Sequence, residues 1–129
     1  MPITKNILLV EDEQSLLKIY SNKLRNSGFN VSVAISGDEA LRKAETERPD
    51  IILLDLMLPG KDGFAVLEEL KLKDGTKDIP VVILSNLGQE SDRARGTALG
   101  AVDYLVKSDV GLMDLVDKVN HYLADPNGA

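Results

Sequence analysis

Short apolar runs alternate with segments of helical spacing along the whole chain, and this alternation restricts the fold more than any other feature. The five apolar runs are residues 7–10, 31–35, 51–54, 81–84 and 104–106. The first, third and fourth are almost unbroken Ile, Leu and Val, which is typical of strands buried on both faces of a parallel sheet. The intervening segments predict helices over residues 14–27, 37–47, 63–73, 89–99 and 110–123.

Five strand–helix repeats imply right-handed crossovers and a parallel sheet covered by helices on both faces. With 129 residues, the chain has the size of one domain and can bury one sizeable core. We therefore expect a single α/β domain over residues 1–129, with its core at about 5–124. Its sheet is predicted to be five-stranded, doubly wound, of order 2-1-3-4-5 and flanked by five helices. In that order the first and third strands are neighbours, and ligands bind beyond their carboxyl ends.

Composition excludes several classes of function. The chain has no Cys, which excludes disulfides, thiolate metal sites and a cysteine nucleophile, and its single His leaves little material for a catalytic triad or a zinc site. A net charge of −6 repels phosphate backbones, so we expect no direct nucleic-acid partner. No apolar run approaches the roughly 18 residues of a membrane span, so we expect a cytoplasmic chain without a membrane partner.

Acidic residues follow two of the buried runs. Glu11, Asp12 and Glu13 come directly after the first run, and Asp55 comes directly after the third. Carboxylates brought together at one sheet edge repel one another unless a cation neutralises them. Oxygen ligands without Cys or His suit a hard divalent ion such as Mg2+. For Asp12 and Glu13, a simple capping role at the start of the next helix remains an open alternative.

A hydroxyl and an ammonium group join these carboxylates at the same predicted edge. Ser85 follows the fourth run and Lys107 follows the fifth. A nucleophilic carboxylate, a metal held by other carboxylates, a lysine and a hydroxyl donor are the groups that phosphoryl transfer needs. Taken singly, Ser85 as a solvated loop residue and Lys107 as a surface charge also remain open.

Four segments together resemble one known family. They are residues 8–13 (LLVEDE), 53–63 (LLDLMLPGKDG), 82–85 (VILS) and 100–107 (GAVDYLVK). In this order and spacing they closely resemble the receiver domains of bacterial response regulators, including the single-domain receivers of chemotaxis type. The resemblance extends over roughly residues 5–124. It implies a flavodoxin-like fold, which is the doubly wound sheet expected from the pattern of apolar runs.

The resemblance also implies a role for each acidic residue. Asp55 corresponds to the phosphoacceptor, which takes a phosphoryl group from the phosphohistidine of a histidine kinase. Glu11 and Asp12 correspond to the acidic pair that holds Mg2+ together with Asp55, and Met57 would contribute its backbone carbonyl oxygen. A protein of this kind is a signalling phosphoacceptor, which supports its own phosphorylation and dephosphorylation but is not a turnover enzyme.

Three further residues correspond to family positions, Lys107 and Ser85 as catalytic residues beside Asp55, and Ser85 and Tyr104 as the switch. Lys107 matches the lysine that contacts the phosphoryl oxygens, Ser85 the hydroxyl residue that moves to bond them, and Tyr104 the aromatic residue that follows inward. In such proteins the movement remodels the face formed by the fourth helix, fifth strand and fifth helix, where a partner binds. Without the motif context, Tyr104 would be interpreted as a half-buried strand residue with a solvated hydroxyl.

The implied partners are a sensor histidine kinase or phosphotransfer protein on one side and a downstream protein target on the other. We expect a monomer or a weak, phosphorylation-dependent dimer. The sequence leaves open which kinase and which target are involved, and how long the phosphoryl group persists. It also leaves open whether the chain stands alone or forms part of a longer regulator.

The chain departs from the family at two places. Ser108 and Asp109 follow Lys107, where many relatives have proline, so this loop is either trans or strained at a cost of about 3 kcal/mol. Asp109 is a candidate N-cap for the last helix. Asn86 stands after Ser85, where a small residue is usual, and is expected to narrow access to the phosphoryl group.

Two other chemistries on the same fold are disfavoured. A flavin carrier needs a loop of Ser, Thr and Gly after the first strand to cradle a phosphate, whereas residues 11–14 are Glu-Asp-Glu-Gln. An aspartyl-phosphate phosphatase is expected to carry a second Asp two positions after its nucleophile, and Gln14 stands there after Asp12. A third alternative stays open, namely a receiver-like interaction module that never takes phosphate, to which Asn86 and Ser108 point.

Overall fold

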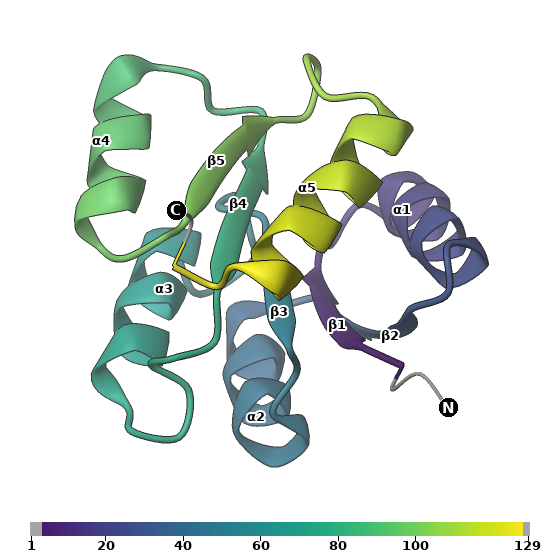
Figure 1. Cartoon of the computed structure of the whole chain (residues 1–129). Helices are drawn as coiled ribbons and strands as arrows, with labels where there is room; N and C mark the ends of the chain where they lie inside the picture. Colours follow the sequence, from purple (N-terminus) through teal and green to yellow (C-terminus); the bar gives the residue numbers. More distant parts are fainter. Residues whose placement is uncertain (1–3, 128–129) are drawn as a thin grey trace.

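The computed structural model describes residues 4–127, so the first three and last two residues of the predicted 1–129 domain lie outside the described part. Its strands are β1 (Asn6–Val10), β2 (Asn30–Ala34), β3 (Ile51–Leu54), β4 (Val81–Ser85) and β5 (Asp103–Val106). Its helices are α1 (Gln14–Asn26), α2 (Gly37–Glu47), α3 (Gly63–Leu72), α4 (Glu90–Ala98) and α5 (Leu112–Ala124). The strands form one parallel sheet of order β2-β1-β3-β4-β5, which confirms the predicted topology (Figure 1).

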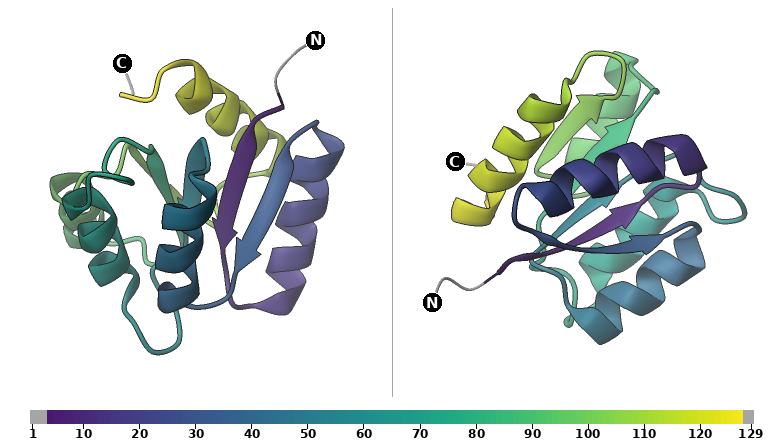
Figure 2. Two further views of the ribbon diagram at one scale, coloured as in Figure 1. Left: turned by 90° about the horizontal axis from the view of Figure 1, so that it is seen from below. Right: turned by 90° about the vertical axis from the view of Figure 1, so that its right-hand side faces the viewer.

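Helices cover both faces of the sheet (Figure 2). The side chains between helices and sheet form two apolar layers. On one face, α1 and α5 pack against alternate residues of β1 and β3, with Leu24 and Leu115 fully buried. On the other face, α2 and α3 pack against the other alternate residues of β1 and β3, with Ala44 and Leu67 fully buried. All residues of β3 are buried because the strand lies in the middle of the sheet between the two layers. Of the helices within residues 4–127, none has the length and apolar character to cross a membrane.

The last helix is the main departure from the predicted elements. It begins at Leu112 with Gly111 as its N-cap, so the predicted start at Val110 and the predicted capping role of Asp109 are both wrong. The backbone N–H groups of Asp109 and Val110 both donate to the carbonyl of Val106, which makes a turn before the helix. The peptide bond after Lys107 is trans, as are all others within residues 4–127.

Charged side chains close the open edge of the sheet at β2. The carbonyl oxygen of Val31 accepts a hydrogen bond from Nη2 of Arg25 on α1 at 3.1 Å. The carbonyl oxygen of Val33 accepts one from Nζ of Lys43 on α2 at 2.5 Å. Glu39, which lies one turn before Lys43, accepts the backbone N–H of the residue after the strand at 2.7 Å. An edge strand with bonded carbonyls is a poor template for pairing with another chain.

Candidate functional site

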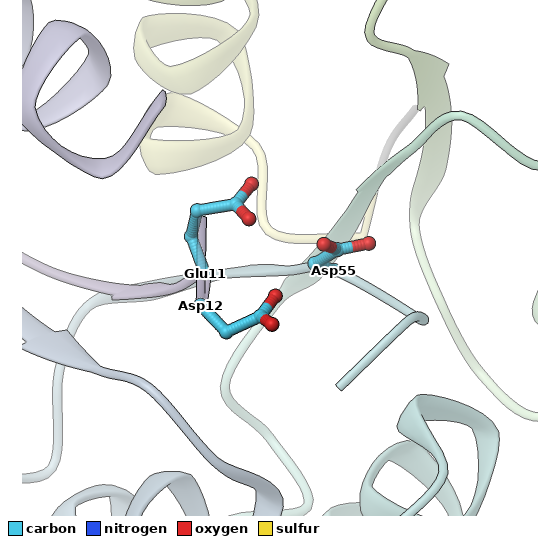
Figure 3. A group of neighbouring side chains, drawn as sticks. All are labelled: Glu11, Asp12 and Asp55. Carbon is cyan, nitrogen blue, oxygen red and sulfur yellow. The ribbon is translucent and has the colours of Figure 1, made fainter. Parts of the chain in front are cut away.

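Three strand ends bring the predicted site residues together. Glu11 and Asp12 follow β1, Asp55 follows β3 and Lys107 follows β5, all at the carboxyl edge of the sheet. One carboxylate oxygen from each of Glu11, Asp12 and Asp55 lies within 4.8 Å of the others. Figure 3 shows these three side chains gathered at the strand ends. Together with Glu13, Met57, Asn86 and Lys107, these residues line an open cleft.

Lys107 links two of these carboxylates through its ammonium group. Its Nζ donates to Oε1 of Glu11 at 2.5 Å and to Oδ2 of Asp55 at 3.0 Å. All three side chains are almost fully buried, with 7%, 2% and 6% of the surface of Lys107, Glu11 and Asp55 exposed. The exposed side chain of Asp12 adds a third carboxylate to this group, so one ammonium group and three carboxylates lie together and the cleft keeps an excess of negative charge.

Burial and the ion pairs act on the pKa values in this cleft. Burial raises the pKa of Glu11, and the negative charge of Asp55 adds to this, while the bond from Lys107 opposes it. Burial also acts to lower the pKa of Lys107, but its hydrogen bonds to Glu11 and Asp55 outweigh burial and leave that pKa raised. The charged ammonium is therefore well stabilised, and the clustered carboxylates favour a further cation.

A tight loop after β3 orients Asp55. Its Oδ1 accepts the backbone N–H of Met57 at 3.1 Å, which leaves Oδ2 facing Lys107. The loop then folds back, and the N–H of Gly63 donates to the carbonyl of Leu56 at 3.0 Å. A Cβ on Gly63 would lie 2.4 Å from Cα of Leu56 and 2.7 Å from the carbonyl oxygen of Asp55. Only glycine permits this approach, so Gly63 fixes the backbone that carries the carboxylate.

The structure places Ser85 differently from the acidic residues. Ser85 ends β4 and is fully buried, so the interpretation as a solvated loop residue is wrong. Its Oγ accepts the backbone N–H of Leu87 at 3.3 Å, and Ser85 is not among the residues that line the cleft. Asn86 does line the cleft, and the narrowing of access to a phosphoryl group by its side chain stays a prediction.

Tyr104 lies on β5 and is 6% exposed. Its hydroxyl donates to the carbonyl oxygen of Leu87, so the side chain is neither half-buried nor solvated through its hydroxyl. The side chain is thus already directed inward while Ser85 still bonds the N–H of Leu87, whereas the resemblance implies that it turns inward only when Ser85 moves. The guanidinium of Arg93 lies over the ring, 5.4 Å from its centre. Burial raises the pKa of Tyr104, with the charge of nearby Asp92 adding to the effect.

The capping alternative for the acidic residues after β1 is not favoured by the geometry. Glu13 occupies the N-cap position of α1, yet its side chain makes no capping hydrogen bond. Asp12 lies with Glu11 and Asp55 at the cleft. Sequence reasoning missed two features, the bond from Lys107 to Glu11 and the contact of Arg93 with Tyr104. The first follows from strand order once both residues are placed at the same edge, whereas nothing in the sequence pattern marks Arg93.

A doubly wound sheet with an acidic cluster, a buried lysine and a hydroxyl residue at its carboxyl edge defines the receiver class of signalling domains. The family model described as the response regulator receiver domain matches residues 7–120. The chain belongs to this family.

Curated relatives are transcriptional regulators. The chain is 42% identical over 105 residues to the alkaline phosphatase synthesis transcriptional regulatory protein PhoP of Bacillus subtilis, covering 81% of this chain and 43% of that protein. It is 44% identical over 117 residues to the transcriptional regulatory protein PrrA of Mycobacterium leprae, covering 91% of this chain and 49% of that protein. The chain thus matches less than half the length of each of these relatives.

Solved structures of receiver domains superpose closely. The chemotaxis response regulator CheY4 of Vibrio cholerae gives a TM-score of 0.84 at 28% identity, covering 92% of this chain and 98% of that one. The receiver domain of sensor histidine kinase PA1611 from Pseudomonas aeruginosa gives a TM-score of 0.87 at 28% identity, covering 95% of this chain and all of that one (100%). That structure has a magnesium ion coordinated in its active site cleft.

Proposed function

We propose that this chain is the phosphoacceptor receiver of a two-component signalling system and that Asp55 accepts the phosphoryl group. The observation that carries the proposal is the arrangement at Asp55: one carboxylate oxygen is held by the backbone N–H of Met57 and the other faces Nζ of Lys107. Asp55 thus has a fixed carboxylate at an open cleft with a cation beside it. This is the positioning and charge neutralisation that phosphoryl transfer requires.

The donor set in the cleft fits Mg2+. Three carboxylates gather there, without Cys or His, and hard oxygen ligands of this kind suit that ion. We propose that Glu11, Asp12 and Asp55 hold it, with the backbone carbonyl of Met57 as a further ligand. The bound ion would supply neutralisation of the charge on the phosphoryl oxygens.

The transfer itself uses the side chains of this chain. A carboxylate oxygen of Asp55 forms a bond to phosphorus while the bond from phosphorus to the donor imidazole nitrogen breaks, and that nitrogen keeps the electron pair and takes up a proton. Lys107 exchanges its bond with Asp55 for bonds to the phosphoryl oxygens and keeps its charge, which its raised pKa favours. Ser85 would turn its hydroxyl from the N–H of Leu87 towards the phosphoryl group.

We further propose that phosphorylation acts on the face formed by α4, β5 and α5, through Tyr104, and that a downstream protein binds there. A groove along this face supports the proposal, because Arg93, Tyr104 and Lys118 line it. The phosphoryl donor would be a sensor histidine kinase or a phosphotransfer protein in the cytoplasm. The receiver unit would be a monomer or a weak dimer formed on phosphorylation.

Incubation with acetyl phosphate and Mg2+, followed by intact-mass measurement, tests the phosphoacceptor proposal. We expect one added phosphoryl group, abolished by EDTA and absent from an Asp55→Asn variant, which keeps the size of the side chain. Absence of phosphorylation in a folded protein that binds Mg2+ would contradict the proposal. A phosphate-independent interaction module would then be the better account, and Asn86→Ala would show whether the side chain in the cleft blocks the donor.

A further inference from the structure

A continuous series of hydrogen bonds runs from the end of β4 to helix α4. The Oγ of Ser85 accepts the backbone N–H of Leu87 at 3.3 Å. The carbonyl oxygen of Leu87 accepts the hydroxyl of Tyr104. The carbonyl oxygen of Tyr104 in turn accepts Nη1 of Arg93 at 3.3 Å. The series connects the residue beside the cleft with a side chain on the outer helix.

Arg93 holds Tyr104 at two places with one planar group. Its guanidinium bonds the backbone carbonyl of Tyr104 and also lies 5.4 Å from the centre of the ring, where the face of the aromatic system attracts a cation. An arginine can make both contacts because its planar group combines stacking with directed N–H donors, whereas the ammonium of lysine is a compact point charge. The two contacts together restrain both the backbone and the ring of Tyr104.

Helix α4 also comes close to Tyr104 at Gly96. Gly96 is its one buried residue, and a Cβ at that position would lie 2.6 Å from Cδ1 of Ile83 and 3.3 Å from Cδ2 of Tyr104. The helix therefore approaches the sheet closely beside Ile83 and the edge of the Tyr104 ring. Arg93, one turn before Gly96, is the charged group that fastens the helix to this ring.

We propose that Arg93 is a positioning residue that holds Tyr104 in its buried orientation, with its hydroxyl on the carbonyl of Leu87. Arg93 contacts neither the phosphoryl site nor the metal ligands and acts through Tyr104. The positioning is a property of the unphosphorylated fold, and only its meaning for signalling rests on the proposed function. Loss of the guanidinium frees the ring to leave the Leu87 carbonyl and turn towards solvent.

Fluorine NMR of the whole chain, labelled with 3-fluorotyrosine, tests this proposal. The chain has three Tyr residues, so three signals are expected, and a Tyr104→Phe variant assigns one of them. In Arg93→Met we expect the Tyr104 signal to shift and to broaden more strongly with a soluble paramagnetic chelate, while the other two signals stay unchanged. Arg93→Lys should give an intermediate result, because lysine keeps the charge without the planar donor group.

Arg95 provides the matched control. It lies on the same helix and its guanidinium also stacks on an aromatic ring, that of Phe64 at 4.2 Å. Arg95→Met should leave the Tyr104 signal unchanged. If the Tyr104 signal of Arg93→Met is as protected as in the parent protein, or if Arg95→Met exposes it equally, the proposal is wrong.

If Arg93→Met fails to fold, Arg93→Gln provides a second variant of similar side-chain length. Its Tyr104 signal is then compared with those of the parent protein and of Arg95→Met in the same way. The measurement needs no phosphoryl donor. A failure of Asp55 to take phosphate would therefore leave this result intact, and a negative NMR result would leave the phosphoacceptor proposal intact.

Discussion

Lys107 and Asp55 come from strands that are not neighbours in the sheet, yet Nζ of Lys107 lies 3.0 Å from Oδ2 of Asp55. The same ammonium group also donates a hydrogen bond to Glu11, which follows β1. The buried ion pairs of Lys107 thus connect the ends of three strands at the carboxyl edge of the sheet. Any ligand that draws Lys107 away from Glu11 and Asp55 must offer negative charge in return, as a phosphoryl group does.

Replacement of Lys107 by Met should destabilise the metal-free fold. It would leave two buried carboxylates without their cation, and breaking a buried ion pair in this way costs about 3–5 kcal/mol. Addition of Mg2+ should restore more stability to this variant than to the parent protein, because the ion replaces the lost charge. Thermal unfolding with and without Mg2+ measures both effects.

Lys118→Met is the control for this loss. Lys118 pairs with Asp103 at 3.4 Å, but its side chain is 47% exposed, so its removal should cost less than about 1 kcal/mol and should not respond to Mg2+. Equal losses for Lys107→Met and Lys118→Met would show that the buried pair does not fasten the sheet edge.

A methyl group added at Gly63 should disturb the loop that carries Asp55. The new Cβ would lie 2.4 Å from a backbone atom of Leu56, so the loop must shift, at a cost of about 1–3 kcal/mol or more. We expect Gly63→Ala to lower the midpoint of urea unfolding and to weaken Mg2+ binding. Gly75→Ala is the matched change, because that Cβ would meet no atom within 4 Å, and it should leave both properties nearly unchanged. A Gly63→Ala protein as stable as Gly75→Ala would contradict this account of the loop.

The open edge at β2 yields a prediction about self-association. Simultaneous replacement of Arg25 and Lys43 by Met frees the carbonyl groups that they bond, and a second copy can then pair with the strand. We expect the double variant to form dimers or larger species in sedimentation measurements, where the parent protein does not do so through this edge.

The control is the double variant Lys23→Met and Arg42→Met. Lys23 and Arg42 lie on the same two helices as Arg25 and Lys43, and their replacement removes the same amount of positive charge. Within the described residues, neither side chain bonds a carbonyl group of β2. If both double variants associate equally, lost net charge rather than an open edge is responsible.

The tyrosines predict how stability depends on pH in the alkaline range. Burial, together with a hydrogen bond to Asp103, raises the pKa of Tyr122 from 10.0 to about 12, and burial also raises those of Tyr20 and Tyr104. Because a phenol loses its proton at lower pH in the unfolded chain than in the folded protein, the contribution of these tyrosines to the free energy of unfolding is fully present below pH 10. That contribution falls as the pH rises towards 12. Ultraviolet absorbance should show phenol ionisation delayed relative to the unfolded chain, and Tyr122→Phe should remove the component near 12. Ionisation of every tyrosine near 10.0 in the folded protein would contradict the prediction.

Most of the fold could be predicted because the buried strands carry their own signal. Residues 51–54 are apolar without a break, and the strand has those same bounds. The start of α5 was predicted too early because an acidic residue before a helix is a common N-cap, and Asp109 stands there. In the structure, a turn that is closed by hydrogen bonds to the carbonyl of Val106 precedes the helix, which begins at Leu112. Local pattern does not report such backbone bonds.

The site was predictable only as far as strand order determines it. Parallel strands place Glu11, Asp55 and Lys107 at one edge, so their proximity follows from the topology. The direction in which a side chain points does not follow from strand order. Ser85 shows this, because its hydroxyl bonds the N–H of Leu87 and the residue does not line the cleft. The contact of Arg93 with Tyr104 depends on the packing of α4, which its weak apolar pattern does not specify.

Chemical trapping of the phosphoryl group tests the central claim most directly. Borohydride reduces an aspartyl phosphate to homoserine, which tandem mass spectrometry locates in the peptide that contains residues 51–61. After treatment with acetyl phosphate and Mg2+, the account predicts homoserine at position 55 and nowhere else. Homoserine at Asp12 instead, or no reduced residue in a protein that has gained a phosphoryl group, would contradict the assignment of Asp55 as the phosphoacceptor.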